Sequence, residues 1–434
     1  GGPTMQDLAI YGGKPAINAS EIKNWPPIDK TDEELVLAAL HEKSQARSTY
    51  TALLEKEFKA FSETAYAYFC NCGGAALHMC IAGCGIGAGD QVIVTSYTWP
   101  SSASCILHNM AVPVFVDIDP ETFLMDPAKI EAAITPRTKA ILVVHLHGLC
   151  CDMDPIWAIA KKHQLKIIED ACQAHNALYK GKKAGTLGDC AAFSFNQNKC
   201  MTSGEAGIFV TNDREIFDRG MTLTGFSDMQ PTKAAPEFPA YAFAHKFANN
   251  EITAAYALAQ LRKFPGYYQQ LIDNAHALHE ELLKAKLKGL KLPYEPANCT
   301  HNWYNYNLRI DFDAIGMGAK TNAEKSQFRN AVCKALQAEG VICGVWQRCI
   351  LPEMTIFRAK NAYGHGYPWA VPGADDGVDY APANFPNAVK YCYSHIAIVQ
   401  ILRAPNDTTM ARKVAEAIKK VFTQLEKIDP AKIS

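Results

Sequence analysis

Between about Gln91 and Asp213 the chain alternates between short apolar runs rich in β-branched residues and longer amphipathic segments. The short runs have the length and composition of strands, and the longer segments have the length of helices. Such alternation is typical of βα units that build a mostly parallel sheet. The expected strands are Val92–Thr95, Pro113–Asp117, Ala140–His145, Lys166–Asp170, Ala191–Phe195 and Gly207–Thr211.

Helix-forming patterns lie before, between and after these strands. Asp154–His163 starts at an acidic cap and ends at a basic residue, and Ala75–Ile86 follows two glycines. Ala, Leu, Gln and Lys dominate from Asn250 to about Leu287, which predicts a long helix. The remainder predicts a strand at Tyr306–Phe312, a helix at Lys325–Glu339, a strand at Val341–Val345 and a final helix at Lys413–Lys427.

The order of these elements predicts an α/β fold with a large domain followed by a smaller α+β domain. In the large domain we expect a mostly parallel mixed sheet flanked by helices. The expected division is an N-terminal arm at residues 1–30, the large domain at 31–265 and the C-terminal domain at 266–434. Tyr363–Pro386 is rich in Gly, Pro and aromatic residues, which predicts a long surface loop of the kind that often carries function.

The composition is that of a folded globular protein, since 48% of the 434 residues are hydrophobic and 20% are charged. The 43 Lys and Arg residues are balanced by 44 Asp and Glu residues, so the basic excess of a typical nucleic-acid-binding protein is missing. No apolar run has the length of a signal-peptide core or of a membrane span. We expect a cytoplasmic protein with no nucleic-acid or membrane partner.

Cysteine is frequent, with 15 residues, but this number is odd and no secretory signal accompanies it. A disulfide framework is therefore not expected. Cys70 with Cys72, or Cys150 with Cys151, could be proposed as metal ligands, but neither pair has a second pair or histidines at zinc-finger spacing. Unpaired cysteines are commonly small buried hydrophobic residues, so we expect no metal.

The segment Glu169–His175 lies at the carboxyl end of a predicted strand, where open α/β sheets bind their ligands. There the carboxylate of Asp170 could pair with a cationic ring nitrogen and so keep a pyridine ring protonated. An aspartate that caps a helix is the alternative, and for an isolated residue it is the more common role.

The segment Phe193–Lys199 leads from an apolar strand through a short polar turn to a lysine, and a glycine-bearing loop, Thr202–Gly207, comes next. A lysine that leaves a buried strand can be desolvated, which lowers the pKa of its ammonium and makes the amine nucleophilic toward an aldehyde. The alternative for Lys199 is a solvated surface position, which most lysines occupy.

Two further features favour a phosphate-bearing aromatic ligand. Gly73 and Gly74 open a predicted helix, where free backbone amides suit a phosphate and glycines let it approach closely. A flexible turn at a helix start is the alternative. Trp99 follows the first predicted strand, where an aromatic side chain could stack on a flat ring, whereas a buried core tryptophan is the ordinary interpretation.

Taken in order, these elements resemble the StrS/DegT-type family of sugar aminotransferases, which have the fold of aspartate aminotransferase (fold type I). The resemblance extends from Leu8–Gly13 to Phe385–Ala388 and the final helix, and so covers nearly the whole chain. Its most specific parts are Asp170–Gln173 and Ser194–Glu205, which have the spacing of the family.

By this resemblance the cofactor is pyridoxal 5'-phosphate (PLP), held as a Schiff base on Lys199 and paired through its pyridinium nitrogen with Asp170. Trp99 would stack on the ring, and Gln173 would lie beside the ring oxygen. The groups that the resemblance assigns to the phosphate are the hydroxyl of Ser194 and the backbone amides of Gly73, Gly74 and Ala75.

Two positions depart from the family pattern. Gly74 stands where the family usually has Thr, so one hydroxyl contact to the phosphate is missing. Lys246–Ala248 stands where the family places an Asn-x-Arg-like segment that reaches across a dimer, before the helix that contains Glu251. The resemblance implies a homodimer with shared active sites, in which Lys246 supplies the missing charge or the phosphate is anchored differently. A solvated loop lysine is the alternative.

The resemblance implies an aminotransferase that moves an amino group from an amino acid, Glu or Gln, to a keto-sugar or keto-cyclitol in amino-sugar or aminocyclitol biosynthesis. Lys199 would act as general base and then as general acid. His175 and Tyr363–Pro386 are candidate substrate contacts, with a structural role as the alternative for His175. The rival functions are another PLP reaction, such as elimination or decarboxylation, and a non-catalytic PLP-binding regulatory protein, against which the intact Lys199 and Asp170 argue.

Overall fold

The computed structural model describes residues 7–224 and 244–433 and contains a seven-stranded sheet at its centre. Its strands are β1 (Tyr66–Cys70), β2 (Gln91–Thr95), β3 (Val112–Val116), β4 (Thr138–Val144), β5 (Lys166–Asp170), β8 (Cys190–Ser194) and β9 (Gly207–Thr211). They lie in the order β1-β9-β8-β5-β4-β2-β3, and β9 runs antiparallel to both its neighbours while the others are parallel. The prediction of a mostly parallel mixed sheet is confirmed.

The six strands expected from the apolar runs are all confirmed, and β1 is an additional strand that the pattern did not reveal. Every residue of β2, β3, β8 and β9 is buried, because helices cover both faces of the sheet. This burial explains why these strands read as continuous apolar runs rather than as alternating ones.

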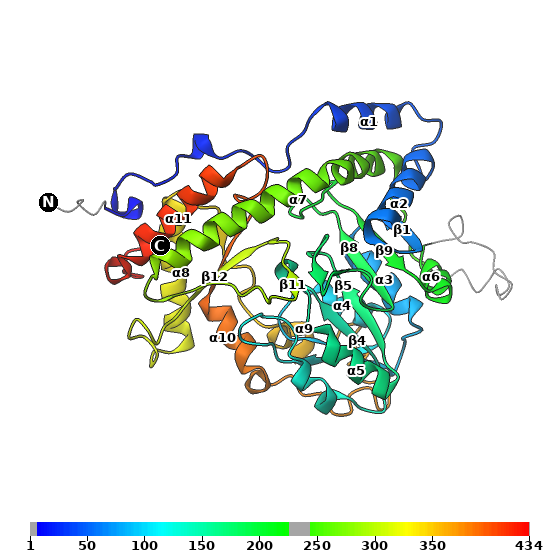
Figure 1. The fold of residues 1–434 in the computed structure, drawn as a ribbon. Coiled ribbons are helices and arrows are strands. Elements are labelled where there is room, and N and C mark those ends of the chain that lie inside the picture. The colour runs from blue at the N-terminus through cyan, green and yellow to red at the C-terminus, as the bar shows by residue number, and fades with distance from the viewer. Residues whose placement is uncertain (1–6, 225–243, 434) are drawn as a thin grey trace.

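The helices extend over much of the chain. They are α1 (Lys30–Leu40), α2 (Thr49–Ser62), α3 (Gly73–Gly83), α4 (Ser101–His108), α5 (Met153–His163), α6 (Arg214–Met221), α7 (Glu251–Ala285), α8 (Asn322–Ala338), α9 (Thr355–Arg358), α10 (Pro386–Ser394) and α11 (Thr408–Phe422). The long α7 packs against α1 and α2 near one end and against α11 near the other (Figure 1). Within the described ranges, no helix has the length and apolar content required to cross a bilayer.

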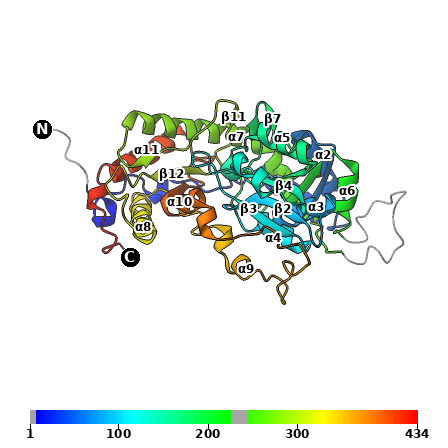
Figure 2. The same ribbon diagram turned by 90° about the horizontal axis from the view of Figure 1, so that it is seen from below.

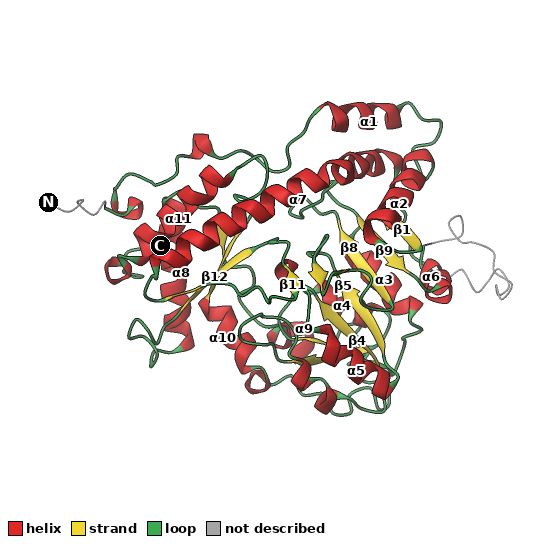
Figure 3. Ribbon diagram, in the orientation of Figure 1, coloured by secondary structure: helices red, strands yellow, loops and turns green. Residues whose placement is uncertain are grey.

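Helices α3, α4 and α6 lie on one face of the large sheet, and α2 and α7 lie on the other. Successive side chains of β8 point alternately to these two faces. Phe193 contacts Phe58 of α2, with ring centroids 5.2 Å apart, whereas the next residue, Ser194, faces Gly73 at the start of α3. Figure 3 shows the strands of this sheet side by side beneath α7.

A smaller antiparallel sheet follows, with the strand order β10-β12-β14-β13. Its strands are β10 (Leu290–Lys291), β12 (Tyr306–Ile310), β13 (Cys343–Gly344) and β14 (His395–Ile398). Helices α8 and α10 pack on it, and in Figure 2 they gather with β12 at the end of the molecule away from β2 and β4. A third sheet joins β6 (Leu178–Tyr179), β7 (Lys182–Lys183) and β11 (Cys299–Thr300).

The expected domain boundary at residues 265 and 266 falls inside α7, which continues through Pro265 without a break. The division therefore stays a prediction, and residues 1–6, 225–243 and 434 of its ranges lie outside the described residues. The N-terminal arm packs against the C-terminal part of the chain, because the side chain of Glu339 accepts hydrogen bonds from the backbone of Ala9 and Ala16.

Candidate active site

A cleft of about 380 Å³ opens at the carboxyl ends of the parallel strands β2, β5 and β8, as the ligand-binding rule for open α/β sheets leads one to expect. It is lined by segments that directly follow these strands and by the start of α3. Seven residues predicted from the sequence lie together in its wall, namely Gly73, Gly74, Trp99, Asp170, Gln173, Ser194 and Lys199.

The carboxylate of Asp170 is fixed at the end of β5. Its Oδ2 accepts a 2.6 Å hydrogen bond from the hydroxyl of Ser102, and its Oδ1 accepts one from the backbone N–H of Cys172 at 3.2 Å. The chain continues from Asp170 through turns and not through a helix, so the helix-capping alternative is wrong. The carboxylate is buried and is held in one orientation toward the cleft.

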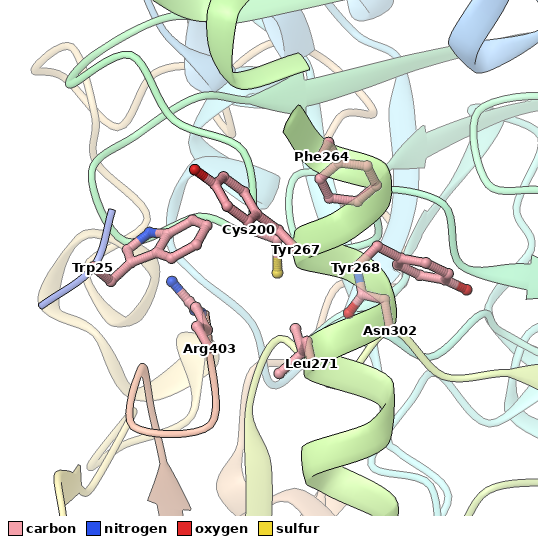
Figure 4. A pocket seen from close by; sticks show the side chains of 8 residues that line it. All are labelled: Trp25, Cys200, Phe264, Tyr267, Tyr268, Leu271, Asn302 and Arg403. Carbon is pink, nitrogen blue, oxygen red and sulfur yellow. The ribbon is translucent and has the colours of Figure 1, made fainter. Parts of the chain in front are cut away.

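Lys199 lies in the loop that joins the antiparallel strands β8 and β9, and its backbone is held from outside the cleft. Its carbonyl oxygen accepts hydrogen bonds from Nε1 of Trp25 at 3.0 Å and from Nη1 of Arg403 at 3.3 Å. Trp25 and Arg403 lie next to each other beside α7, at a small cavity that Cys200 also lines (Figure 4). The Lys199 side chain extends to the other side, into the cleft, with Nζ 5.0 Å from the ring centre of Tyr304.

The pKa of the Lys199 ammonium differs from the expectation. Burial by itself lowers the pKa of the ammonium, but Tyr304, Cys172 and the carboxylate of Asp170 raise it, and the net pKa lies above the ordinary value. The predicted lowering is therefore wrong for the protein chain alone. The physical reason is that the groups around the amine, Tyr304 first among them, together favour its charged form by more than burial disfavours it.

The first turn of α3 forms a concave corner of the cleft. A Cβ built on Gly73 would lie 3.0 Å from both Sγ of Cys172 and Cβ of Ser194, so a side chain there would require these neighbours to shift. Ala75, whose backbone amide is also predicted to bind the phosphate, is not part of the cleft wall. Its N–H donates to Sγ of Cys72 at 3.3 Å.

Trp99 and Gln173 complete the predicted set. The side chain of Trp99 is 56% exposed, so the alternative of a buried core tryptophan is wrong. Its ring lies 6.4 Å from that of Trp346, centroid to centroid. Gln173 is held by its Oε1, which accepts a 2.6 Å hydrogen bond from the backbone N–H of His147.

Together these groups fit PLP. One wall carries a fixed carboxylate for a ring nitrogen, another carries an amine for an aldehyde, and the glycine-led helix start leaves room for a phosphate. When bound, PLP supplies an electron sink for charge that develops at a substrate carbon.

Two expected substrate contacts lie elsewhere. His175 is fully buried behind the sheet, with its ring centroid 5.3 Å from that of Phe193, and burial lowers its pKa to about 3. Tyr363–Pro386 packs on the edge of the large sheet, where the Tyr380 hydroxyl donates to the carbonyl oxygen of Pro113 at 2.5 Å. Neither lines the cleft of this chain. For the fully buried His175 the predicted substrate contact is therefore wrong and the structural alternative holds, whereas substrate contact by Tyr363–Pro386 stays a prediction.

Lys246 is exposed and also lies outside the wall of the cleft. The next residue, Phe247, accepts a 2.8 Å hydrogen bond at its carbonyl oxygen from the backbone N–H of Asn71. Asn249 donates to the carbonyl oxygen of Cys70 at 3.0 Å. This segment therefore runs along the end of β1, close to the start of α3.

All 15 cysteines are free thiols. Cys70, Cys150 and Cys151 are buried, and burial raises the pKa of the Cys70 and Cys150 thiols. Over residues 7–224 and 244–433, no three His, Cys, Asp or Glu side chains come together as ligands for a metal ion.

Sequence reasoning missed several residues that build the site. Ser102 could have been found, because it follows the carboxyl end of β2 by a few residues, as Trp99 does. Tyr304, Trp346 and Arg403 could not, since they come from distant parts of the chain and only the tertiary fold brings them to the cleft or to the Lys199 loop.

Comparison with known proteins agrees with this geometry. The model of the DegT/DnrJ/EryC1/StrS aminotransferase family matches residues 26–364. GDP-perosamine synthase of Caulobacter vibrioides is 40% identical over 287 residues, which are 66% of this chain and 73% of that protein. L-glutamine:2-deoxy-scyllo-inosose aminotransferase of Micromonospora echinospora is 34% identical over 325 residues, which are 72% of this chain and 77% of that protein.

Solved structures show the same fold. The crystal structure of 3-amino-5-hydroxybenzoic acid (AHBA) synthase aligns with a TM-score of 0.79 and 26% identity, over 94% of this chain and 100% of that one. The structure of S. venezuelae DesV aligns with a TM-score of 0.75 and 25% identity, over 92% and 95% of the two chains. The chain belongs to the DegT/DnrJ/EryC1/StrS aminotransferase family and is a PLP-dependent aminotransferase of fold type I.

Proposed function

We propose that this aminotransferase moves an amino group from glutamate or glutamine to the ketone of a sugar or a cyclitol. The observation that carries the proposal is that Lys199 and Asp170 line one cleft with a glycine-led helix start. The names of the relatives support the substrate classes, since one names L-glutamine with an inosose and another names an amino sugar linked to GDP.

In the proposed site, Lys199 carries the cofactor through its Nζ. Once the amino group of the donor has replaced it on the cofactor, the same nitrogen would take a proton from the α-carbon of the donor as a general base and later deliver a proton as a general acid. Asp170 keeps the ring nitrogen protonated, and the hydrogen bond from Ser102 keeps its carboxylate in place for that role. Without the carboxylate of Asp170, the positive charge on the ring nitrogen would have no negative partner.

The other predicted residues hold the cofactor from its remaining sides. Trp99 stacks on the ring, and Gln173 lies beside the ring oxygen. The phosphate binds to the hydroxyl of Ser194 and to backbone amides at the start of α3, drawn from Gly73, Gly74 and Ala75. The Ala75 amide becomes available to the phosphate only if it gives up its contact with Sγ of Cys72.

We propose further that the enzyme is a homodimer whose active sites contain groups from both chains, with Lys246 as the cation of the phosphate site. Exposed apolar side chains on and before α1, namely those of Ile28, Leu37 and Leu40, support a covered surface there. Mixing a Lys199→Ala variant with a Lys246→Ala variant tests the idea, because a shared site would restore activity in part of the hybrid dimers. A fully active monomer would overturn it.

The substrate proposal is tested with the pyridoxamine form of the enzyme. Incubation with a panel of keto-sugars, nucleotide-linked keto-sugars and keto-cyclitols should return the pyridoxal absorbance for one class of acceptor. Incubation of the pyridoxal form with glutamate and glutamine should give the corresponding keto acid. Release of ammonia or carbon dioxide from an amino acid, with no keto acid, would instead support elimination or decarboxylation.

A further inference from the structure

An open space lies on the cleft side of Gly74. A Cβ built on this residue would meet nothing closer than 3.7 Å, and the atoms at that distance are Sγ of Cys72 and Oγ of Ser101. Ser101 is the first residue of α4, and it lines the cleft together with Gly74 and Ser194. The hydroxyl of Ser101 therefore lies beside Gly74, a position of this corner that has room for a side chain but carries none.

The hydroxyl of Ser101 is also available for a ligand. The hydroxyl of the next residue, Ser102, is engaged, because it donates to Asp170 and lies 3.0 Å from Oγ1 of Thr98. The half-buried Ser101 hydroxyl, in contrast, makes no hydrogen bond to any side chain or backbone group in the described ranges 7–224 and 244–433.

We propose that Ser101 is a ligand of the cofactor phosphate and supplies from α4 the hydroxyl that position 74 of α3 lacks. A phosphate monoester carries about −1.5 to −2 charges at neutral pH and accepts several hydrogen bonds at once. Gly73, Gly74 and Ser194 offer donors from α3 and β8, and Ser101 adds one from the neighbouring helix. The inference rests on the placement of PLP described under the proposed function.

Cofactor affinity tests the inference without relying on turnover. The full-length protein is dialysed to equilibrium against PLP or against pyridoxal, which has no phosphate. Ser101→Ala should weaken PLP binding about tenfold or more, the scale of one hydrogen bond to a charged group, and should leave pyridoxal binding unchanged. Ser104→Ala is the matched control, because Ser104 lies on α4 one turn further on and does not line the cleft.

A compensating substitution makes the test more specific. Gly74 does not have a positive φ and has room for a Cβ, so Gly74→Thr can be built without backbone strain. In the Ser101→Ala background, Gly74→Thr should recover most of the lost PLP affinity. Recovery would show that the two positions serve the same phosphate, because a general effect on folding would not be reversed by a hydroxyl on another helix.

Two results would count against Ser101. Unchanged PLP affinity in Ser101→Ala overturns the inference, and so does an equal loss for PLP and pyridoxal, which indicates a structural role. Ser194→Ala separates this failure from failure of the proposed site. If Ser194→Ala weakens PLP relative to pyridoxal and Ser101→Ala does not, only Ser101 is misassigned. If neither variant discriminates, the proposed position of the phosphate is wrong as well.

Discussion

The indole N–H of Trp25 donates a 3.0 Å hydrogen bond to the backbone carbonyl oxygen of Lys199. Arg403 reaches the same oxygen and also donates to the carbonyl oxygen of Asn198 at 2.6 Å. The N-terminal arm and the segment after β14 thus hold the backbone of the proposed catalytic lysine from behind. These are positioning residues, since they act on the cleft only through Lys199.

Trp25→Phe keeps an aromatic ring and removes only the N–H donor. We expect kcat to fall by up to about tenfold, the worth of one ordinary hydrogen bond, while PLP stays bound. The pH titration of the cofactor absorbance should shift as well, because the amine would be less firmly placed. Trp157→Phe is the control, since Nε1 of Trp157 also donates to a backbone carbonyl, that of Leu187, but away from the cleft. Wild-type kinetics and spectra in Trp25→Phe would contradict the positioning role.

Lys199 should be the residue that carries the cofactor covalently. Borohydride reduction of the holoenzyme followed by peptide mapping should find the pyridoxyl group on Lys199. Lys199→Ala should abolish turnover, because the general base is lost together with the covalent link. An adduct on any other lysine would disprove the assignment.

Asp170 and Ser102 should show graded effects. Asp170→Asn should retain the cofactor but lose about a hundredfold or more in kcat, roughly a few kcal/mol in the barrier, because an amide cannot keep the ring nitrogen protonated. Ser102→Ala leaves the carboxylate and removes only its 2.6 Å hydrogen bond, so a smaller loss, about tenfold, is expected. The two rate losses are measured by comparing the single-turnover rate of each variant with that of the wild type, with glutamate as the donor. A Ser102→Ala variant that is as impaired as Asp170→Asn would mean that the serine does more than orient the carboxylate.

His175 should make the folded protein sensitive to acid. Burial lowers its pKa to about 3 in the folded state, against about 6.5 in an unfolded chain, so the folded state holds it neutral. Its full contribution to stability is present above pH 6.5 and is lost as the pH falls from there toward 3, by up to ~1.4 kcal/mol per pH unit. Unfolding of wild type and His175→Leu by urea at pH 7.5 and pH 5.5 checks this, and the variant should lose less stability between the two. Equal losses would show that His175 is protonated without penalty.

The large sheet could be predicted from the sequence because its strands are buried on both faces and stand out as apolar runs. β1 was missed, since Tyr66–Cys70 lies before the alternating region and follows a helix without a clear turn signal. A strand as short as β13 has too few residues to show any periodicity in the sequence. The bounds expected there, Val341–Val345, are therefore too wide, and the strand has two residues.

The part of the site that follows strand ends could also be predicted, because position along the chain there fixes position in space. Asp170 and His175 show the limit of this rule. They lie five residues apart in one segment, yet the first faces the cleft and the second packs behind the sheet against Phe193. Tyr304 and Arg403 reach the site only through packing of the C-terminal part, which no local pattern encodes.

The antiparallel course of β9 limits how much length variation the chain can accept near the proposed catalytic lysine. The loop that carries Lys199 is closed by the pair Ser194 and Gly207 and by the hydrogen bond from Phe195 N to Ala206 O at 2.8 Å. One inserted residue can add up to roughly 3.3–3.6 Å of chain, comparable to the span of a hydrogen bond, and would carry the amine out of reach of its reaction partner. An insertion in this loop should therefore cost more activity than an insertion of the same length in a βα connection that does not carry Lys199.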